Sequence, residues 1–292
     1  AMYESTPADL CADLFYLVAF PEHKLGKNVL GTRDSVNSMT PDMLRKHMDR
    51  FYSPASTVAC FCGKFERDKI ISLCKRYFSS PANKSAIPAL PKADFCPGVH
   101  IFDKKTEQNQ IVIGFSAPSL GSDSRLAWQP IASMLGGSAS SRLFRRLREE
   151  QGLVYSVDAC ASSYLSAGVF AVSMGVSRES EKKAVLTAAE VLREFPDTVT
   201  EEELDLARDH YLSGLIMSLE SNSARAARYG TGELLLGGAI SEKELEEKIR
   251  GVSIDEIRSL ARSFSSLSDA CICAVGRTAG AKFYNTVVSG KK

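Results

Sequence analysis

The sequence lacks most of the short motifs by which catalytic sites are recognised. Its four histidines are all more than five residues apart. No H-x-x-H, H-x-x-E-H or H-x-x-x-H motif therefore places two imidazoles on one face of a helix. A G-x-S-x-G elbow, a G-x-G-x-x-G loop and a P-loop are also missing. These absences argue against a local zinc site, a serine-hydrolase elbow and a nucleotide-binding loop.

The sequence also has little net charge and no long apolar run. The net charge is +1 at pH 7, so composition gives no electrostatic reason to expect nucleic-acid or membrane partners. No apolar run approaches the ~20 residues that a bilayer span needs. The first residues show neither the basic region nor the apolar core of a signal peptide. We therefore expect a soluble, cytoplasmic protein, with a true N-terminus that is unseen if the chain is a fragment.

An internal repeat is the most informative feature that is present. Residues 39–63 reappear at 252–276 without a gap, at a constant offset of 213 positions. Identical pairs include Asp42 with Asp255, Phe51 with Phe264 and Gly63 with Gly276. The second copy has a long lead-in, whereas the chain begins shortly before the first. We interpret the chain as about one and a half copies of a duplicated unit, with roughly 115 positions missing from the first.

A proline-rich segment separates the two copies. Residues 79–98 show neither helical nor alternating apolar spacing. We predict that residues 1–80 form the C-terminal part of a first domain. Residues 81–98 are predicted to be a linker, and residues 99–292 a complete second domain.

Apolar spacing predicts the secondary structure. Helices are expected at 7–20, 41–51, 68–77, 124–135, 141–150, 180–195, 201–218, 221–236, 241–250 and 253–263, with one more at the C-terminus. Strands are expected at 57–63, 99–103, 110–117, 153–162, 169–174 and 270–275. On helix 41–51, Leu44, Met48 and Phe51 are predicted to form a buried stripe. The pattern favours an α+β fold, a duplicated unit of antiparallel sheet with helices packed on one face.

The eight cysteines form no C-x-x-C motif. The pairs Cys60/Cys62 and Cys271/Cys273 lie in predicted strands. Valine takes the place of cysteine at counterpart positions of the repeat, which is typical of cysteine acting as a small core hydrophobe. We predict core packing in a reducing compartment rather than metal or disulfide roles.

One segment combines groups that can bind a peptide. The loop Gly136-Gly137-Ser138 leads into an arginine-rich helix that contains Arg148, and Tyr155 follows on a strand. A guanidinium and a phenol brought together could hold a peptide carbonyl or a developing oxyanion. The residues alone leave open a solvated basic helix beside a core tyrosine, and glycines that simply end a helix.

Three stretches of the chain resemble the pitrilysin and mitochondrial-processing-peptidase family of inverted zincins. They lie at 2–32, 140–157 (SSRLFRRLREEQGLVYSV) and 218–238, the last followed by VSIDEI at 252–257. The resemblance implies two homologous α+β domains that face each other as a clamshell. It also implies zinc in the complete enzyme, held in the first domain by an H-x-x-E-H motif and a further Glu. This chain carries neither, so we expect it to contain no catalytic residue, to bind no metal and to be inactive alone.

The same resemblance assigns roles in the second domain. It implies that Arg148 and Tyr155 match the family's Arg and Tyr and contact the substrate backbone near the scissile bond. It further implies that Gly136, Gly137 and Ser138 match a glycine-rich loop that contacts peptide in processing peptidases.

Three functional hypotheses follow. The first is the C-terminal fragment of a zinc-dependent endopeptidase, which supplies a substrate-binding wall for a peptide or protein. Its expected partners are the missing N-terminal half-domain or a homologous subunit, with self-association of exposed apolar faces. The second is a non-catalytic partner or assembly subunit of a peptidase heterodimer. The third, and weakest, is a short structural protein.

Overall fold

The computed structural model describes residues 6–78 and 90–290, which form two compact units. Unit 1 contains residues 6–29, 91–211 and 247–290, and unit 2 contains residues 30–78, 90 and 212–246. Residues 81–89 of the predicted linker lie outside the described residues. The predicted division into two domains and a linker stays a prediction.

Unit 1 is built on a five-stranded sheet with the order β1-β5-β2-β4-β3. Its strands are β1 (Gly98–Phe102), β2 (Asn109–Ala117), β3 (Val154–Ser163), β4 (Gly168–Val176) and β5 (Cys271–Val275). Three of the four strand pairs are antiparallel, and β1 and β5 run parallel. The α+β class is confirmed. The parallel pair was not predicted. β1 and β5 lie far apart in the chain, and their residues do not indicate which strand each pairs with.

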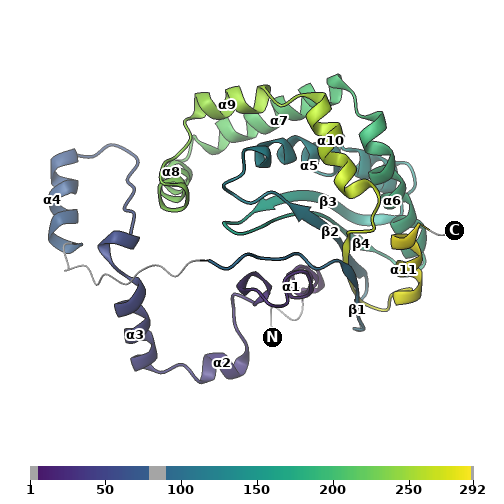
Figure 1. Ribbon diagram of the computed structural model, residues 1–292, viewed down its shortest axis with the longest axis horizontal. Coiled ribbons are helices and arrows are strands. Elements are labelled where there is room, and N and C mark those ends of the chain that lie inside the picture. Colours follow the sequence, from purple (N-terminus) through teal and green to yellow (C-terminus); the bar gives the residue numbers. More distant parts are fainter. Residues whose placement is uncertain (1–5, 79–89, 291–292) are drawn as a thin grey trace. The chain divides into compact units, whose positions relative to one another are not determined.

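One face of this sheet carries the main core. It is covered by α5 (Trp128–Leu135), α6 (Glu181–Thr198), α10 (Ile254–Ser265) and α11 (Ala281–Ser289) (Figure 1). Aromatic rings fill the middle of this layer, with the ring centroids of Phe170 and Phe264 4.9 Å apart and Trp128 against both. Burial of such rings contributes about 2–3 kcal/mol each.

A further helix, α1 (Pro7–Ala19), packs on the opposite face of the sheet (Figure 1). Phe15 is buried against β2, where Gly114 makes room, since a Cβ there would lie 2.2 Å from the Phe15 ring. Cys11, Cys271 and Cys273 are buried beside it, which confirms the core packing predicted for Cys271 and Cys273. Helices therefore cover both faces of the sheet rather than one. The additional helix is α1, which the repeat had led us to place in the first domain.

The remaining helices of the chain complete the two units. They are η2 (Lys24–Gly26), η4 (Asp123–Ala127), η5 (Phe144–Glu149), α7 (Glu201–Ser218) and α9 (Glu242–Arg250). Unit 2 contains α2 (Arg33–Asn37), α3 (Pro41–Phe51), η3 (Pro54–Ser56), α4 (Arg67–Tyr77) and α8 (Asn222–Leu236). Among the described residues, no helix is both long enough and apolar enough to cross a membrane.

Two expectations for unit 2 are wrong. The stripe predicted to be buried on α3 is exposed, with Leu44 at 55%, Met48 at 51% and Phe51 at 38% of their maximal surface. Residues 57–63 form no strand, so Cys60 is exposed rather than buried in a core. A strand requires a pairing strand, and no strand of the described residues pairs with residues 57–63.

The second copy of the repeat behaves differently. Ile257, Ala261 and Phe264 on α10, the counterparts of the exposed α3 stripe, are fully buried. The counterpart of residues 57–63 contains β5, which is paired on both sides. Gly63 and Gly276 nevertheless share a φ of 135°. The local backbone is therefore repeated even where the packing is not.

Candidate functional site

The arginine-rich segment forms η5, which is a π-helix rather than an α-helix. Its wider turn is closed by the amide of Glu150, which donates to the carbonyl of Arg145 at 2.9 Å. Leu143 and Leu147 are fully buried. The 100° per residue of an α-helix does not apply to this turn. Arg148 is exposed.

A left-handed glycine connects this helix to β3. Gly152 has a φ of 59°, and its amide donates to the carbonyl of Arg148 at 3.2 Å. The amide of Leu153 donates to the carbonyl of Leu147 at 2.8 Å. These bonds hold the start of β3 directly against the end of η5. A non-glycine residue in this conformation would be strained.

Tyr155 occupies an irregular position on the strand. Val154 pairs with Val176 and Ser156 with Gly175, so Tyr155 is the extra residue of a β-bulge. β3 is also the last strand of the sheet, and no other strand of the described residues pairs with its outer side. A bulge redirects a side chain, and the Tyr155 side chain is 70% exposed. The core-tyrosine alternative is therefore wrong.

The structure brings Arg148 and Tyr155 together. The Cζ atom of Arg148 lies 6.0 Å from the centroid of the Tyr155 ring and 5.2 Å from that of Phe144. These are distances at which a guanidinium is attracted to an aromatic face. A guanidinium and a phenol ring therefore lie close together at the outer edge of the sheet.

The glycine-rich loop has a structural constraint of its own. Gly136 ends α5 and is buried against β3, where a Cβ would lie 2.2 Å from the amide nitrogen of Ala159. Gly137 is exposed. Ser138 lines a pocket of about 430 Å³ together with Ser133, Ser141, Arg145 and His210. The Ser141 hydroxyl is buried there without a hydrogen-bond partner among the described residues. The peptide-contacting role of the loop stays a prediction.

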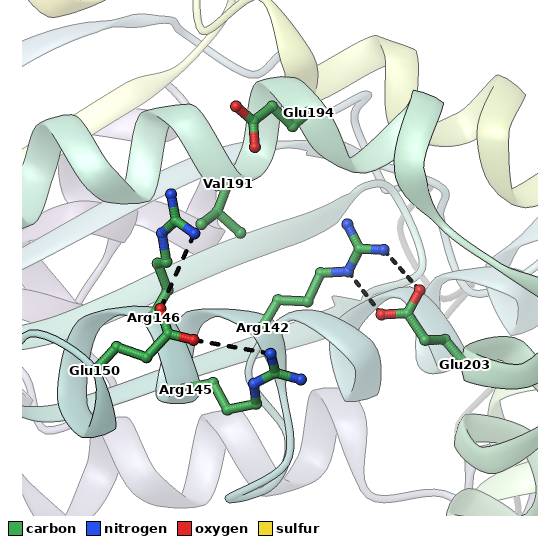
Figure 2. A pocket seen from close by; sticks show the side chains of 7 residues that line it. All are labelled: Arg142, Arg145, Arg146, Glu150, Val191, Glu194 and Glu203. Atoms are coloured by element: carbon green, nitrogen blue, oxygen red, sulfur yellow. Dashed lines mark hydrogen bonds and ion pairs between the residues drawn. The ribbon is translucent and has the colours of Figure 1, made fainter.

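Sequence reasoning missed the role of Arg142, which is shown in Figure 2. Its Nε and Nη2 donate to the two carboxylate oxygens of Glu203 at 2.8 and 2.6 Å. Nη1 donates to Thr198 Oγ1 at 2.6 Å, and the guanidinium lies 5.0 Å from the Phe195 ring centroid. Burial alone would raise the pKa of Glu203, but the bonds from Arg142 and Thr200 bring it below its usual range. The signal available in the sequence was the Thr200–Glu203 capping box, which the structure confirms.

The other arginines of this helix are surface residues. Arg145 and Arg146 lie 3.8 and 4.0 Å from the carboxylate oxygens of Glu150. Together with Arg142, Val191, Glu194 and Glu203 they line a pocket of about 270 Å³ (Figure 2). Its cations are matched by carboxylates, so it offers no excess charge to an ionic ligand. Arg145, Arg146 and Arg148 are exposed, as in the solvated-helix alternative, whereas Arg142 is partly buried.

The face of the sheet that carries α1 is polar over its outer strands. Asp158 on β3 pairs across the ladder with Ser173 on β4, and Ser156 lies two residues before Asp158 on the same face. All three side chains are exposed. Burial of part of its surface raises the pKa of the Asp158 carboxyl. This surface can hydrogen-bond an extended chain laid across it.

The described residues do not fit a zinc ion. No three histidine, cysteine, aspartate or glutamate side chains among them are grouped as a metal would require. His23 instead caps η2, its Nδ1 accepting from the amide of Leu25 at 3.1 Å.

Solved structures share this fold. The chain superposes on a chain of complex III2 from Candida albicans with a TM-score of 0.83 at 18% identity, covering 94% of this chain and 68% of that one. A protease from Helicobacter pylori gives 0.79 at 18% identity, with the same coverage. A peptidase M16 inactive domain from Pseudomonas fluorescens gives 0.81 at 14% identity, covering 96% of this chain and 68% of that one. The α+β fold of this chain is therefore shared with these three solved structures.

Sequence comparison identifies the family. Residues 38–211 match the peptidase M16 inactive domain, and the chain belongs to this family, which confirms the predicted resemblance. It is 31% identical over 262 residues to the uncharacterized zinc protease YmxG of Bacillus subtilis, covering 89% of this chain and 64% of that protein. An uncharacterized zinc protease of Mycobacterium tuberculosis is 29% identical over 272 residues, covering 91% and 62%. The chain thus spans less than two thirds of the length of these relatives.

Proposed function

We propose that this chain supplies the non-metal-binding wall of a zinc-dependent endopeptidase. The observation that carries the proposal is the Arg148 guanidinium beside the exposed Tyr155 ring, at the outer edge of β3. Membership of the M16 family and relatives named zinc proteases support it. In this proposal the zinc ligands are supplied by a polypeptide segment or subunit other than this chain.

The geometry suits an extended peptide. The outer side of β3 presents main-chain groups that no described strand pairs with, and an extended chain can bond to such an edge. Arg148 offers five N–H donors and Tyr155 a hydroxyl, both exposed to a ligand. Donors fixed in this way can hold a peptide carbonyl and stabilise negative charge that develops on it. The polar surface of Ser156, Asp158 and Ser173 extends the same binding wall.

A second candidate is a non-catalytic partner or assembly subunit. It is favoured by the exposed apolar stripe of Leu44, Met48 and Phe51, because neighbouring exposed apolar side chains are typical of an interaction surface. A related fold occurs in a chain of complex III2. We propose that a missing half-domain or a homologous subunit covers this stripe, and that the isolated chain self-associates through it.

The two candidates are separated by mass and metal content. A natural protein heavier than this chain with one zinc per molecule supports the endopeptidase. A protein of this mass without zinc, in complex with a homologous subunit, supports the partner role.

The role of Arg148 is tested by kinetics of the zinc-bearing assembly that contains this chain. Arg148→Ala should lower kcat/KM for peptide hydrolysis about 100-fold, the usual cost of one such donor, and Tyr155→Phe should also lower it. Arg146→Ala, an exposed arginine beside Glu150, is the matched control and should change kcat/KM less than twofold, as is typical of surface pairs. Equal kcat/KM for Arg148→Ala and the unmodified protein would contradict the proposal.

A further inference from the structure

Phe144 is the third member of the group formed by Arg148 and Tyr155. Its half-buried ring lies on the first turn of η5, with its centroid 5.2 Å from the Arg148 Cζ atom. The Tyr155 ring lies 6.0 Å from the same atom. Arg148 is thus in contact range of two aromatic rings from two different elements.

Arg148 differs from the neighbouring arginines in its interaction partners. Arg142 is bonded to Glu203, and Arg145 and Arg146 lie near Glu150. Within the described parts of the chain, no carboxylate pairs with Arg148. Stacking on aromatic faces orients a guanidinium while it leaves the N–H edge available. The rings therefore restrain the side chain without consuming the donors that a ligand would use.

The anchoring of Phe144 makes this restraint possible. The flanking residue Leu143 and the neighbouring turn residue Leu147 are fully buried in the main core. Phe144 packs against the same core while one side of its ring meets the guanidinium. Tyr155, by contrast, stands on a bulge and is mostly exposed. Of the two rings, Phe144 is the fixed one.

We propose that Phe144 is a positioning residue that holds the Arg148 guanidinium in the orientation in which it meets the substrate backbone. The inference rests on the proposed function of Arg148. Phe144 itself acts through Arg148. It limits the rotamers of the Arg148 side chain before substrate binds, so that less conformational entropy is lost on binding.

The positioning is testable on this chain by NMR, without any activity. The Arg148 Nε–H and Cδ–H resonances, assigned with Arg148→Lys, should show ring-current shifts. Phe144→Leu keeps an apolar side chain but removes the ring, and should reduce these shifts by about half, since one of two stacked rings is lost. Phe144→Tyr should preserve them. Phe283→Leu, which removes a ring from a similar contact with Lys182, is the matched control.

Unchanged Arg148 resonances in Phe144→Leu would overturn the inference. Because a leucine in this place could disturb packing, the backbone spectrum of each variant is compared first. Loss of the Arg148 shifts with the remaining spectrum preserved supports positioning. If Phe144→Leu changes the whole spectrum, Phe144→Tyr decides, since preserved shifts support the contact and lost shifts overturn it.

The consequence for function is measured in the zinc-bearing assembly. Phe144→Leu should lower kcat/KM about fivefold, which corresponds to the ~1 kcal/mol of a cation–π contact. Phe144→Tyr should restore it, and adding Phe144→Leu to Arg148→Ala should cause no further loss. If Arg148→Ala lowers kcat/KM and Phe144→Leu does not, only the positioning inference fails. If Arg148→Ala has no effect, the proposed function fails and the inference with it.

Discussion

Arg142 donates two hydrogen bonds to the carboxylate of Glu203, at 2.8 and 2.6 Å, although the two residues lie 61 positions apart. The same guanidinium bonds to Thr198 at the end of α6. Arg142 therefore joins the start of the segment that forms η5 to the end of α6 and to the first turn of α7. This clamp holds the element that carries the candidate site.

Removing the clamp should destabilise the protein. Arg142→Leu leaves the partly buried Glu203 carboxylate without its charged donor, so we expect a loss of about 2 kcal/mol in the free energy of unfolding. Urea denaturation measures this value. Arg146→Leu removes an exposed arginine from the same helix and should cost less than about 0.5 kcal/mol. Equal losses for the two variants would show that the clamp adds no stability.

Stability should fall at alkaline pH because of Tyr284. Burial, followed by its 2.6 Å hydrogen bond to the buried Glu181 carboxylate, raises the pKa of Tyr284 above its ordinary value of 10.0. The unfolded chain therefore loses this proton at a lower pH than the native protein does. The contribution of Tyr284 is fully present below about pH 10 and is lost as the pH rises further, by ~1.4 kcal/mol per pH unit.

Urea denaturation between about pH 9 and pH 11 measures this slope. Tyr284→Phe should be less stable at neutral pH, where a buried hydrogen bond to a carboxylate is lost. Its stability should decline less steeply above pH 10 than that of the unmodified protein. Tyr77→Phe, at an exposed ring, controls for removal of a hydroxyl and should leave the slope unchanged. Parallel slopes for the unmodified protein and Tyr284→Phe would refute the prediction.

The repeat offers a matched pair of core and surface positions. Phe264 is fully buried, whereas its counterpart Phe51 is 38% exposed. Phe264→Ala should cost about 3–5 kcal/mol through lost burial and a cavity. Phe51→Ala should cost less than about 1 kcal/mol in the isolated chain. Thermal unfolding measures the stability of both variants. A large loss of stability for Phe51→Ala would show that the α3 stripe is already covered, for example by self-association.

Gly136 should not tolerate a side chain. A Cβ would lie 2.2 Å from the amide nitrogen of Ala159, so α5 would have to move away from β3. We expect Gly136→Ala to cost about 1–3 kcal/mol, as overpacking usually does. Gly121→Ala, where nothing lies within 4 Å of the added Cβ, is the control and should be nearly neutral. An unchanged melting temperature for Gly136→Ala would mean that the loop is free to shift.

The candidate site was partly accessible to sequence reasoning. The sequence pattern and the resemblance singled out Arg148 and Tyr155, and the structure places the Arg148 guanidinium near the Tyr155 ring. Their contact with a substrate backbone stays a prediction. The wide turn of η5, the bulge at Tyr155 and the contact with Phe144 were not predicted. They depend on how η5 packs on the sheet and how β3 pairs with β4. A prediction that assumes a regular α-helix and a regular strand cannot show them.

The two copies of the repeat separate what the sequence by itself determined from what tertiary structure decided. Local features recur in both: Thr40 and Ser253 cap α3 and α10, and Gly63 and Gly276 share a φ of 135°. Their causes lie within a few residues, so the sequence alone determines them. Burial and strand formation occur in the second copy only, where Ile257 is buried and β5 pairs on both sides. Only the tertiary structure decides these, because a strand needs hydrogen-bonding neighbours and a buried face needs a surface that excludes water.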